Sequence, residues 1–254
     1  SPSPSPSPTQ VTGLHQWGAV TLFHGLPSDR IRAITQGADG MMWFGTEAGL
    51  AKFDGRRTQT LVDAQFPQGR VLSLHTDTNG WLWVGTDNGA ARIIGSRVEA
   101  IPNLKGQTIN AIIEPEKGRL MMATEQGMVY ECLVKPDGSF EVKQLLPQPR
   151  ESADPETPGL LPLTSLTVAH DQMLAGSLSR GLLAIENGSA KEVQARRSAF
   201  FIRSLETDTR GQLWIGTKAR KNEPALRSAE GADAVDEEET VTGSVLALQA
   251  GRFG

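Results

Sequence analysis

The sequence predicts an all-β fold, a β-propeller of four-stranded antiparallel blades, about five of them in this chain. Three observations support this prediction. The unit Trp-x-Gly-Thr occurs at Trp43, Trp83 and Trp214. Two weaker copies, "RLMMATEQG" and "QMLAGSLSRG", fill the interval between the second and the last. Successive copies are separated by roughly 40 residues or somewhat more, which is the size of a propeller blade, and turn residues recur too often for long helices.

The second copy shows why each element is expected to be a strand. "RVLSLHTD" alternates apolar and polar residues, as a half-buried strand does, and "DTNG" supplies an Asp and a Gly suited to a tight turn. "WLWVGT" is rich in aromatic and β-branched residues and predicts the second strand. "TDNG" predicts another turn, and "GAARIIG" and "SRVEAI" predict the third strand and the outer strand.

The tryptophans are expected to pack between blades. Successive residues of a strand face opposite sides of its sheet. Leu82 and Val84 should therefore contact one neighbouring blade while Trp83 contacts the other. Gly85 leaves room for close backbone approach, and the hydroxyl of Thr86 can accept from turn amides. We interpret the repeated unit as a packing device, with ligand stacking on the indoles as the less favoured alternative.

The segment "HGLPSDRIRAITQGADGMMWFGTEAGLAKFDGRR" (His24–Arg57) resembles the repeat of the two-component regulator propeller family. The resemblance is strong for copies one, two and five, and weak for copies three and four. It implies an exported, often membrane-tethered propeller of the kind that forms the sensing half of histidine kinases. Ligands of that family include carbohydrates and other extracellular signals. The resemblance also implies rings that usually close with seven blades.

Five blades are expected, with a Ser/Pro-rich flexible tail at residues 1–15 ahead of a propeller at 16–254. The blades should lie near residues 30–62, 70–101, 107–146, 163–194 and 200–254. The last unit ends at a third strand, so we expect residues 17–23 to supply its outer strand and close the ring. The alternative is that these five blades are part of a seven-bladed ring. The "SPSPSPSP" tail favours an extended stalk and an exported, periplasmic or extracellular protein.

Composition and motifs favour a non-catalytic protein. The net charge of −4 is too mild for a nucleic-acid partner, and no apolar run is long enough to span a membrane. The four histidines lack metal-ligand spacing, and Cys132 has no disulfide partner. No nucleophile elbow or phosphate loop occurs in the sequence. We therefore expect no catalytic residues, no metal and no cofactor.

The candidate ligand site lies on one face of the ring. Loops between second and third strands should share this face with the loops between blades. Arg30, Arg70 and Gln107 are expected at equivalent starts of innermost strands, where arginines suit carboxylate, phosphate or sulfated-sugar ligands. The alternative is that each Arg pairs with a nearby acid such as Asp29. The full candidate set for binding a small molecule or carbohydrate is Arg30, Arg70, Gln107, Asp87, Asn88, Arg180, Lys218 and Arg220.

Two long insertions, residues 147–162 and 218–242, fall on the same face and are candidate contacts for a protein partner. The second contains an acidic run at residues 230–239, which we interpret as a solvated loop. A scaffold subunit of a larger complex is therefore the alternative to a sensor module. A third hypothesis is an enzyme similar to the streptogramin lyases, which are propellers with related repeats; no His of the loop face matches theirs.

Overall fold

The structure is a computed structural model that describes residues 20–146, 162–193, 201–218 and 243–248. The regular structure in these ranges is nearly all β-strand, arranged as five antiparallel sheets in which strands adjacent in sequence are paired. Two short 3-10 helices, η1 (Leu22–His24) and η2 (Pro102–Leu104), precede the first and third sheets. Neither of these two helical turns is long and apolar enough to cross a membrane.

The sheets follow one another along the chain. The first sheet contains β1 (Ile31–Gln36), β2 (Met42–Thr46), β3 (Gly49–Phe53) and β4 (Thr58–Thr60), and the second contains β5 (Val71–Thr76), β6 (Leu82–Thr86), β7 (Gly89–Ile94) and β8 (Arg97–Ala100). The third contains β9 (Ile109–Glu116), β10 (Arg119–Thr124), β11 (Val129–Val134) and β12 (Phe140–Leu146). The fourth contains β13 (Leu163–Ala169), β14 (Gln172–Ser177), β15 (Gly181–Glu186) and β16 (Ser189–Glu192), and the fifth contains β17 (Phe201–Thr207), β18 (Leu213–Lys218) and β19 (Gly243–Leu248).

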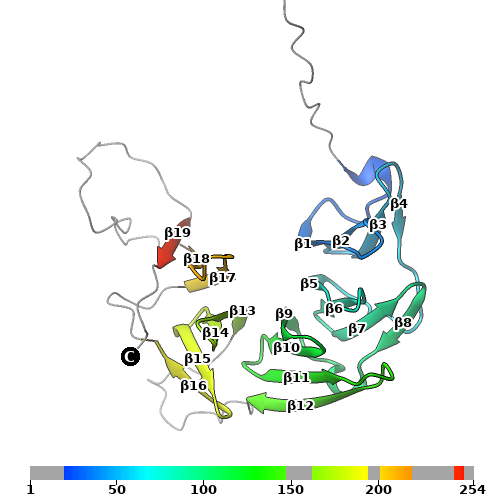
Figure 1. The fold of residues 1–254 in the computed structure, drawn as a ribbon. Coiled ribbons are helices and arrows are strands. Elements are labelled where there is room, and N and C mark those ends of the chain that lie inside the picture. Colours follow the sequence, from blue (N-terminus) through cyan, green and yellow to red (C-terminus); the bar gives the residue numbers. More distant parts are fainter. Residues whose placement is uncertain (1–19, 147–161, 194–200, 219–242, 249–254) are drawn as a thin grey trace, which may run out of the picture.

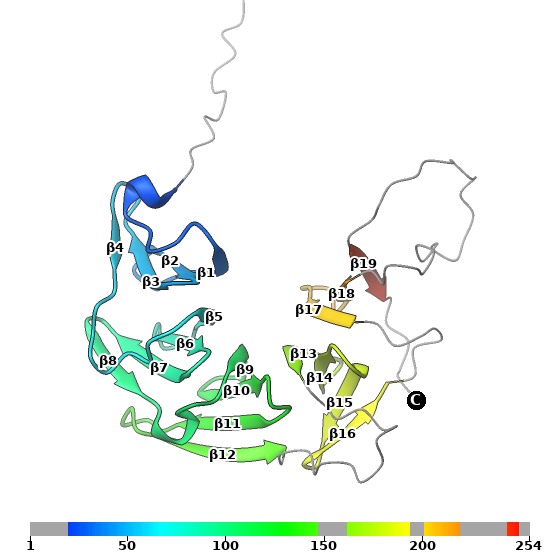
Figure 2. The ribbon, with the colours of Figure 1, turned by 180° about the vertical axis from the view of Figure 1, so that it is seen from behind.

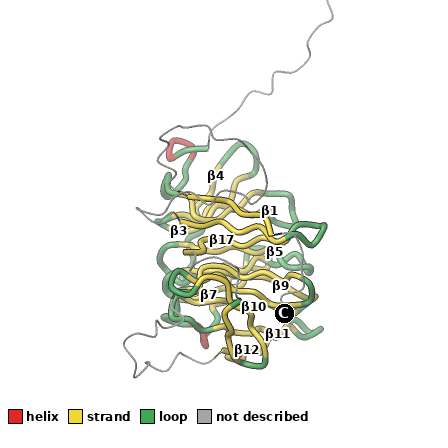
Figure 3. Tube along the Cα trace, turned by 90° about the vertical axis from the view of Figure 1, so that its left-hand side faces the viewer, coloured by secondary structure: helices red, strands yellow, loops and turns green. Residues whose placement is uncertain are grey.

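The five sheets stand side by side as blades around a common centre, which confirms the predicted propeller (Figures 1 and 2). The first strand of each sheet is innermost, and contacts between sheets run in order through β1, β5, β9, β13 and β17. Figure 3 shows the strands of successive sheets stacked one above another. In Figure 1 the arc is open between the first and fifth sheets.

The tryptophan position of the first four repeats packs forward, against the next sheet. Trp83 is fully buried and shares a core cluster with Ile112, Leu120 and Met122 of the third sheet. Leu82 and Val84, on the opposite side of the same strand, pack backward in a cluster that includes Trp43. This division of β6 between two interfaces is the one that its alternating side-chain directions predict. Clusters of the same kind join the third to the fourth sheet and the fourth to the fifth.

The two end sheets expose the residues that elsewhere are covered by a neighbouring sheet. Trp214 is 40% exposed, although Trp83 at the equivalent position of the second sheet has no exposed surface. On the first sheet Ile34 is 57% exposed. The difference follows from position: each of these side chains lies on a face of the arc against which the described residues place no further sheet.

The turns before Trp83 and Trp214 are closed by a carboxylate. In the second sheet Asp77 accepts from the backbone N–H of Asn79 and Trp81 at 2.9 and 2.8 Å, and its other oxygen accepts from Trp83 Nε1 at 2.8 Å. Asp208 makes the equivalent bond to Trp214 Nε1 at 3.1 Å. The predicted role of the Asp in "DTNG" is therefore confirmed, and it also fixes the indole ring.

The predicted closing strand is wrong in its described part. Of residues 17–23, only the last four are described, and Leu22–Phe23 begin η1 instead of an outer strand. The left-handed Gly25 caps this helical turn, and its N–H donates to Leu22 O at 2.9 Å. The fifth sheet has three strands in the described ranges, none of them from this segment. The flexible tail at 1–15 lies outside the described residues.

Candidate ligand-binding site

Every innermost strand contains a β-bulge at the same place. In β1, Ile31 pairs with Thr46 and Ala33 pairs with Gly45, so Arg32 has no partner on β2. The same shift occurs in the other four sheets. A bulge adds one residue to one strand and redirects its side chain. The five bulge residues are Arg32, Leu72, Asn110, Thr164 and Arg203.

In four of the five sheets a glycine before Thr or Ser makes room for this bulge, and in the third sheet Ala123 takes its place. Gly85 lies opposite Ser73, the residue after the bulge in β5. A Cβ on Gly85 would lie 2.2 Å from Ser73 Oγ and 2.8 Å from Ile109 Cγ2 of the third sheet. Gly176 and Gly216 have similarly close neighbours. A larger residue at Gly85 would therefore push both the bulged strand and the next sheet away.

The five bulge residues line a single cavity of about 280 Å³ at the centre of the arc. This volume is close to the lower end of the range for small-molecule sites. Its wall combines cations, one carboxylate, neutral polar groups and apolar surface. The lining residues are Arg32, Arg70, Leu72, Asn110, Glu125, Pro162, Thr164, Leu178 and Arg203.

Two of the three arginines in the wall already have carboxylate partners. Arg32 forms an ion pair with Glu47. Arg70 Nε donates to Asp87 Oδ2 at 2.8 Å, and its backbone N–H donates to Asp87 Oδ1 at 3.0 Å. The Asp87 carboxylate raises the pKa of the Arg70 guanidinium above its usual value. Both acids directly follow a Gly-Thr pair, on the turn between the second and third strands.

Arg203 differs from these two arginines. It forms no hydrogen bond or ion pair with any side chain in the described ranges. In their own sheets Arg32 and Arg70 pair with Glu47 and Asp87, which follow the Gly-Thr pair, whereas the residue at that place in the fifth sheet is Lys218. Glu125 forms no ion pair with a described side chain, although its charge contributes to the raised pKa of Arg70. The cavity thus holds one available cation and one available carboxylate.

Two neutral side chains of the cavity wall, Asn110 and Thr164, are held by hydrogen bonds to the backbone of the following sheet. Asn110 Nδ2 donates to Leu163 O at 2.8 Å. Thr164 Oγ1 lies 2.8 Å from Ile202 O of the fifth sheet and 3.1 Å from Gly176 O of its own sheet, and it can donate to either carbonyl. The Asn110 carbonyl oxygen is left to accept from a ligand. These bonds hold the wall in place without a ligand.

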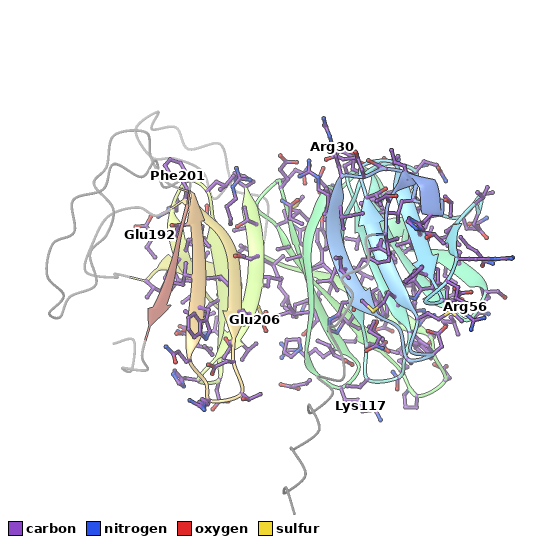
Figure 4. All side chains as sticks on the ribbon, turned by 90° about the horizontal axis from the view of Figure 1, so that it is seen from above. Arg30, Arg56, Lys117, Glu192, Phe201 and Glu206 are labelled. Carbon is purple, nitrogen blue, oxygen red and sulfur yellow. The ribbon has the colours of Figure 1, made fainter. Side chains whose placement is uncertain are left out.

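The structure brings only some of the predicted site residues together. Arg70 lines the cavity with Asp87 bound to it, and Asn88 lies on the same turn with its side chain near Gln68 O at 3.5 Å. Arg30 projects away from the face at which the innermost strands begin (Figure 4). Arg180 is turned outward by an ion pair with Glu192 at 2.5 Å.

The expected equivalence of Gln107 with Arg30 and Arg70 is wrong by one residue. The turn amides of the first two sheets donate to Arg30 O and Arg70 O, and the equivalent amide of Glu125 donates to Thr108 O. Thr108 therefore occupies the third equivalent position, and Gln107 is absent from the cavity wall. Lys218 ends β18, and its side chain is not among those described. Arg220 and nearly all of both insertions lie outside the described residues.

Sequence reasoning missed the five bulge residues, because the alternation of a regular strand does not predict that their side chains face the central cavity. These residues are Arg32, Leu72, Asn110, Thr164 and Arg203. The signal that could have found four of them is the glycine opposite the bulge, which in the third sheet is replaced by Ala123. In Figure 4, Arg30 and Phe201 lie on one face, where β1 and β17 begin, and Lys117 lies on the opposite face.

The described part of the chain presents no acid–base pair in the cavity. His24, His75 and His170 are all absent from its wall. His75 lies near the far end of β5, its Nε2 is 3.9 Å from Glu114 Oε2, and burial lowers its pKa. Cys132 is buried, and burial raises the pKa of its thiol to about 12. No group of three or more potential metal ligands gathers in the described ranges.

Comparison with known proteins gives the same fold. The chain resembles the extracellular domain of a hybrid two component system from B. thetaiotaomicron, at 22% identity and a TM-score of 0.64, covering 79% of this chain and 29% of that one. It resembles virginiamycin B lyase from Staphylococcus aureus at 14% identity and a TM-score of 0.56, and the match covers 87% of this chain and 70% of the lyase. It also resembles PorZ, a surface component of the type-IX secretion system of Porphyromonas gingivalis, at 13% identity and a TM-score of 0.54. This match covers 73% of this chain and 31% of PorZ.

At these identities the likeness shows the fold alone, and the chain spans less than a third of the length of the extracellular domain. No curated protein matches the sequence. A family model described as "Two component regulator propeller" matches residues 25–48 and 65–88, which contain β1–β2 and β5–β6. The chain is thus a β-propeller that carries two component regulator propeller repeats in its first and second blades.

Proposed function

We propose that this propeller is a non-catalytic, extracytoplasmic sensor-type module that binds a small molecule in its central cavity. The observation that supports the proposal is the repeated bulge, which directs one side chain from each of the five sheets into one space. Packing alone does not require this, because the sheets are already joined by four apolar clusters. Bulges that redirect side chains are common beside binding and active sites.

The cavity also has the composition of a recognition site. Its wall combines apolar surface with a few polar groups whose positions are fixed by hydrogen bonds, as ligand pockets generally do. The family match in the first two blades favours the sensor role. The extracellular domain from B. thetaiotaomicron, which has the same fold, favours a location outside the cytoplasm.

A thermal-shift screen with sugars, organic acids and divalent cations tests this function. A ligand at 100 times its dissociation constant should add about 2.7 kcal/mol of stability, which shifts the melting temperature by roughly 5–10 °C. Thr164→Val and Asn110→Ala should reduce the shift, and Arg56→Gln, on the outer turn between β3 and β4, should leave it unchanged. A screen without any shift, or shifts equal in all variants, would argue against a cavity ligand.

A scaffold role is the second candidate function, and the exposed end sheets favour it. Trp214 and Ile34 present apolar surface on opposite ends of the arc. PorZ, which shares the fold, is a component of a secretion system. If the screen gives no ligand, and Trp214→Ser together with Ile34→Ser abolishes association in light scattering, the scaffold role is the better description.

A further inference from the structure

We propose that the ligand of the central cavity is a small hydroxylated monocarboxylate, with its carboxylate held by Arg203. This inference rests on the proposed function and specifies its ligand. It is based on how charge is distributed around the wall and on which groups are already occupied.

The first step is the difference among the three arginines. The guanidinium groups of Arg32 and Arg70 each form an ion pair with an acid of their own blade. Arg203 has no such partner in the described ranges, so none of its five N–H donors is taken by a described residue. Its planar fork matches the two oxygens of a carboxylate. Arg203 is thus the strongest available anion receptor of the cavity.

The second step is that the opposite charge in the wall limits the ligand to one anionic group. Glu125 lines the same cavity and forms no ion pair with a described residue, and the cation on which its charge acts, Arg70, is already bound by Asp87. A ligand with a second carboxylate near Glu125 would be repelled, because like charges in contact disfavour ionisation and binding. A hydroxyl group there would instead donate to the Glu125 carboxylate.

The third step concerns the neutral part of the wall. Asn110 uses one N–H on Leu163 O, and Thr164 uses its hydroxyl proton on a backbone carbonyl. What remains toward the cavity is mainly acceptor capacity, from the Asn110 carbonyl and the Thr164 lone pairs. Hydroxyl groups of a ligand are the matching donors. A carboxylate at one end and hydroxyls along the body satisfy all these groups together.

Matched pairs of acidic and neutral sugars test the inference directly. The probes are D-galacturonate against D-galactose and D-glucuronate against D-glucose, measured by titration calorimetry at low and at moderate salt. We expect each acid to bind about tenfold more tightly than its neutral partner, since a hydrogen bond to a charged group adds roughly this factor. The dicarboxylate galactarate should bind no more tightly than galacturonate.

The variants Arg203→Gln, Arg203→Lys and Arg56→Gln complete the test. Arg203→Gln should remove the preference for the acids, Arg203→Lys should keep part of it, and Arg56→Gln should keep all of it. Arg203 and Arg56 are both exposed, so both glutamine variants should fold.

Equal binding of acid and neutral sugars, or a preference that survives Arg203→Gln, would overturn the carboxylate assignment and leave the cavity as the ligand site. The carboxylate assignment also fails if none of these sugar acids binds while a compound of the screen without a carboxylate does. If no compound binds the cavity at all, the proposed function fails as well.

Discussion

Replacing Trp83 by alanine should destabilise the fold far more than the same change at Trp214. Both residues occupy the same place in the repeat, and both donate their indole N–H to an aspartate of the preceding turn. They differ in burial: Trp83 has no exposed surface, and Trp214 is 40% exposed. The pair therefore isolates the contribution of packing against a following sheet.

The expected magnitudes follow from this burial. Trp83→Ala removes a fully buried indole and leaves a cavity between the second and third sheets, at a cost of about 4 kcal/mol. Trp214→Ala removes a partly hydrated side chain, and solvent fills the space, so the cost should be about 1–2 kcal/mol. For a chain of this size the difference corresponds to roughly 5–10 °C in melting temperature.

Chemical denaturation of both variants, followed by circular dichroism, measures the two costs. Trp83→Phe is the control for a variant that fails to fold, because it keeps an aromatic ring in the interface while losing the bond to Asp77. Equal costs for Trp83→Ala and Trp214→Ala would refute the reasoning, since they would mean that the covering sheet adds nothing to the tryptophan's contribution.

Three further predictions concern other buried groups. Arg92→Met should lower the unfolding free energy by about 2 kcal/mol in denaturation experiments. The buried Arg92 guanidinium pairs with Glu99 and donates to Gly138 O of the next sheet at 2.8 Å, and its loss leaves Gly138 O unpaired and Glu99 with Arg97 alone. Burial lowers the pKa of His75 below 6.5, so the unfolded chain takes up this proton first. The melting temperature should therefore fall as the pH drops from about 7 toward the folded-state pKa and be level above 7, and a wild-type slope that persists in His75→Gln would contradict this assignment. The buried Cys132 thiol, with its pKa raised to about 12, should react with a thiol reagent at pH 8 only after denaturant is added, and rapid native labelling would be inconsistent with its burial.

The repeat was predictable from sequence because it is written in residue types with strong local preferences. The Asp and Gly of "DTNG" specify the turn, and the alternation in "RVLSLHTD" and "WLWVGT" specifies strands. The direction in which Trp83, Leu82 and Val84 pack followed from alternation alone. These are local rules, and tertiary contacts reinforce them here.

The cavity wall was not predictable in the same way. A bulge shifts side-chain direction by one residue, and neither Arg32 nor Arg203 carries a local signal that separates it from an ordinary strand residue. For that reason the sequence pattern indicated Arg30 and Gln107 instead. Arg70 was predictable because it directly precedes its strand in the second blade. The prediction of a closing strand was wrong because Leu22–His24 forms its backbone hydrogen bonds locally, in a 3-10 turn that ends at Gly25.

Thiol labelling of single-cysteine variants along the innermost strands tests the repeated bulge most directly. In a background without Cys132, cysteines at positions 32, 72, 110, 164 and 203 should all label rapidly, because each side chain faces the central cavity. Cysteines at 71, 109, 163 and 202, where the present side chains have no exposed surface, should label only on unfolding. Rapid labelling at these four neighbours, or protection at the five bulge positions, would contradict the shared cavity on which the proposed function depends.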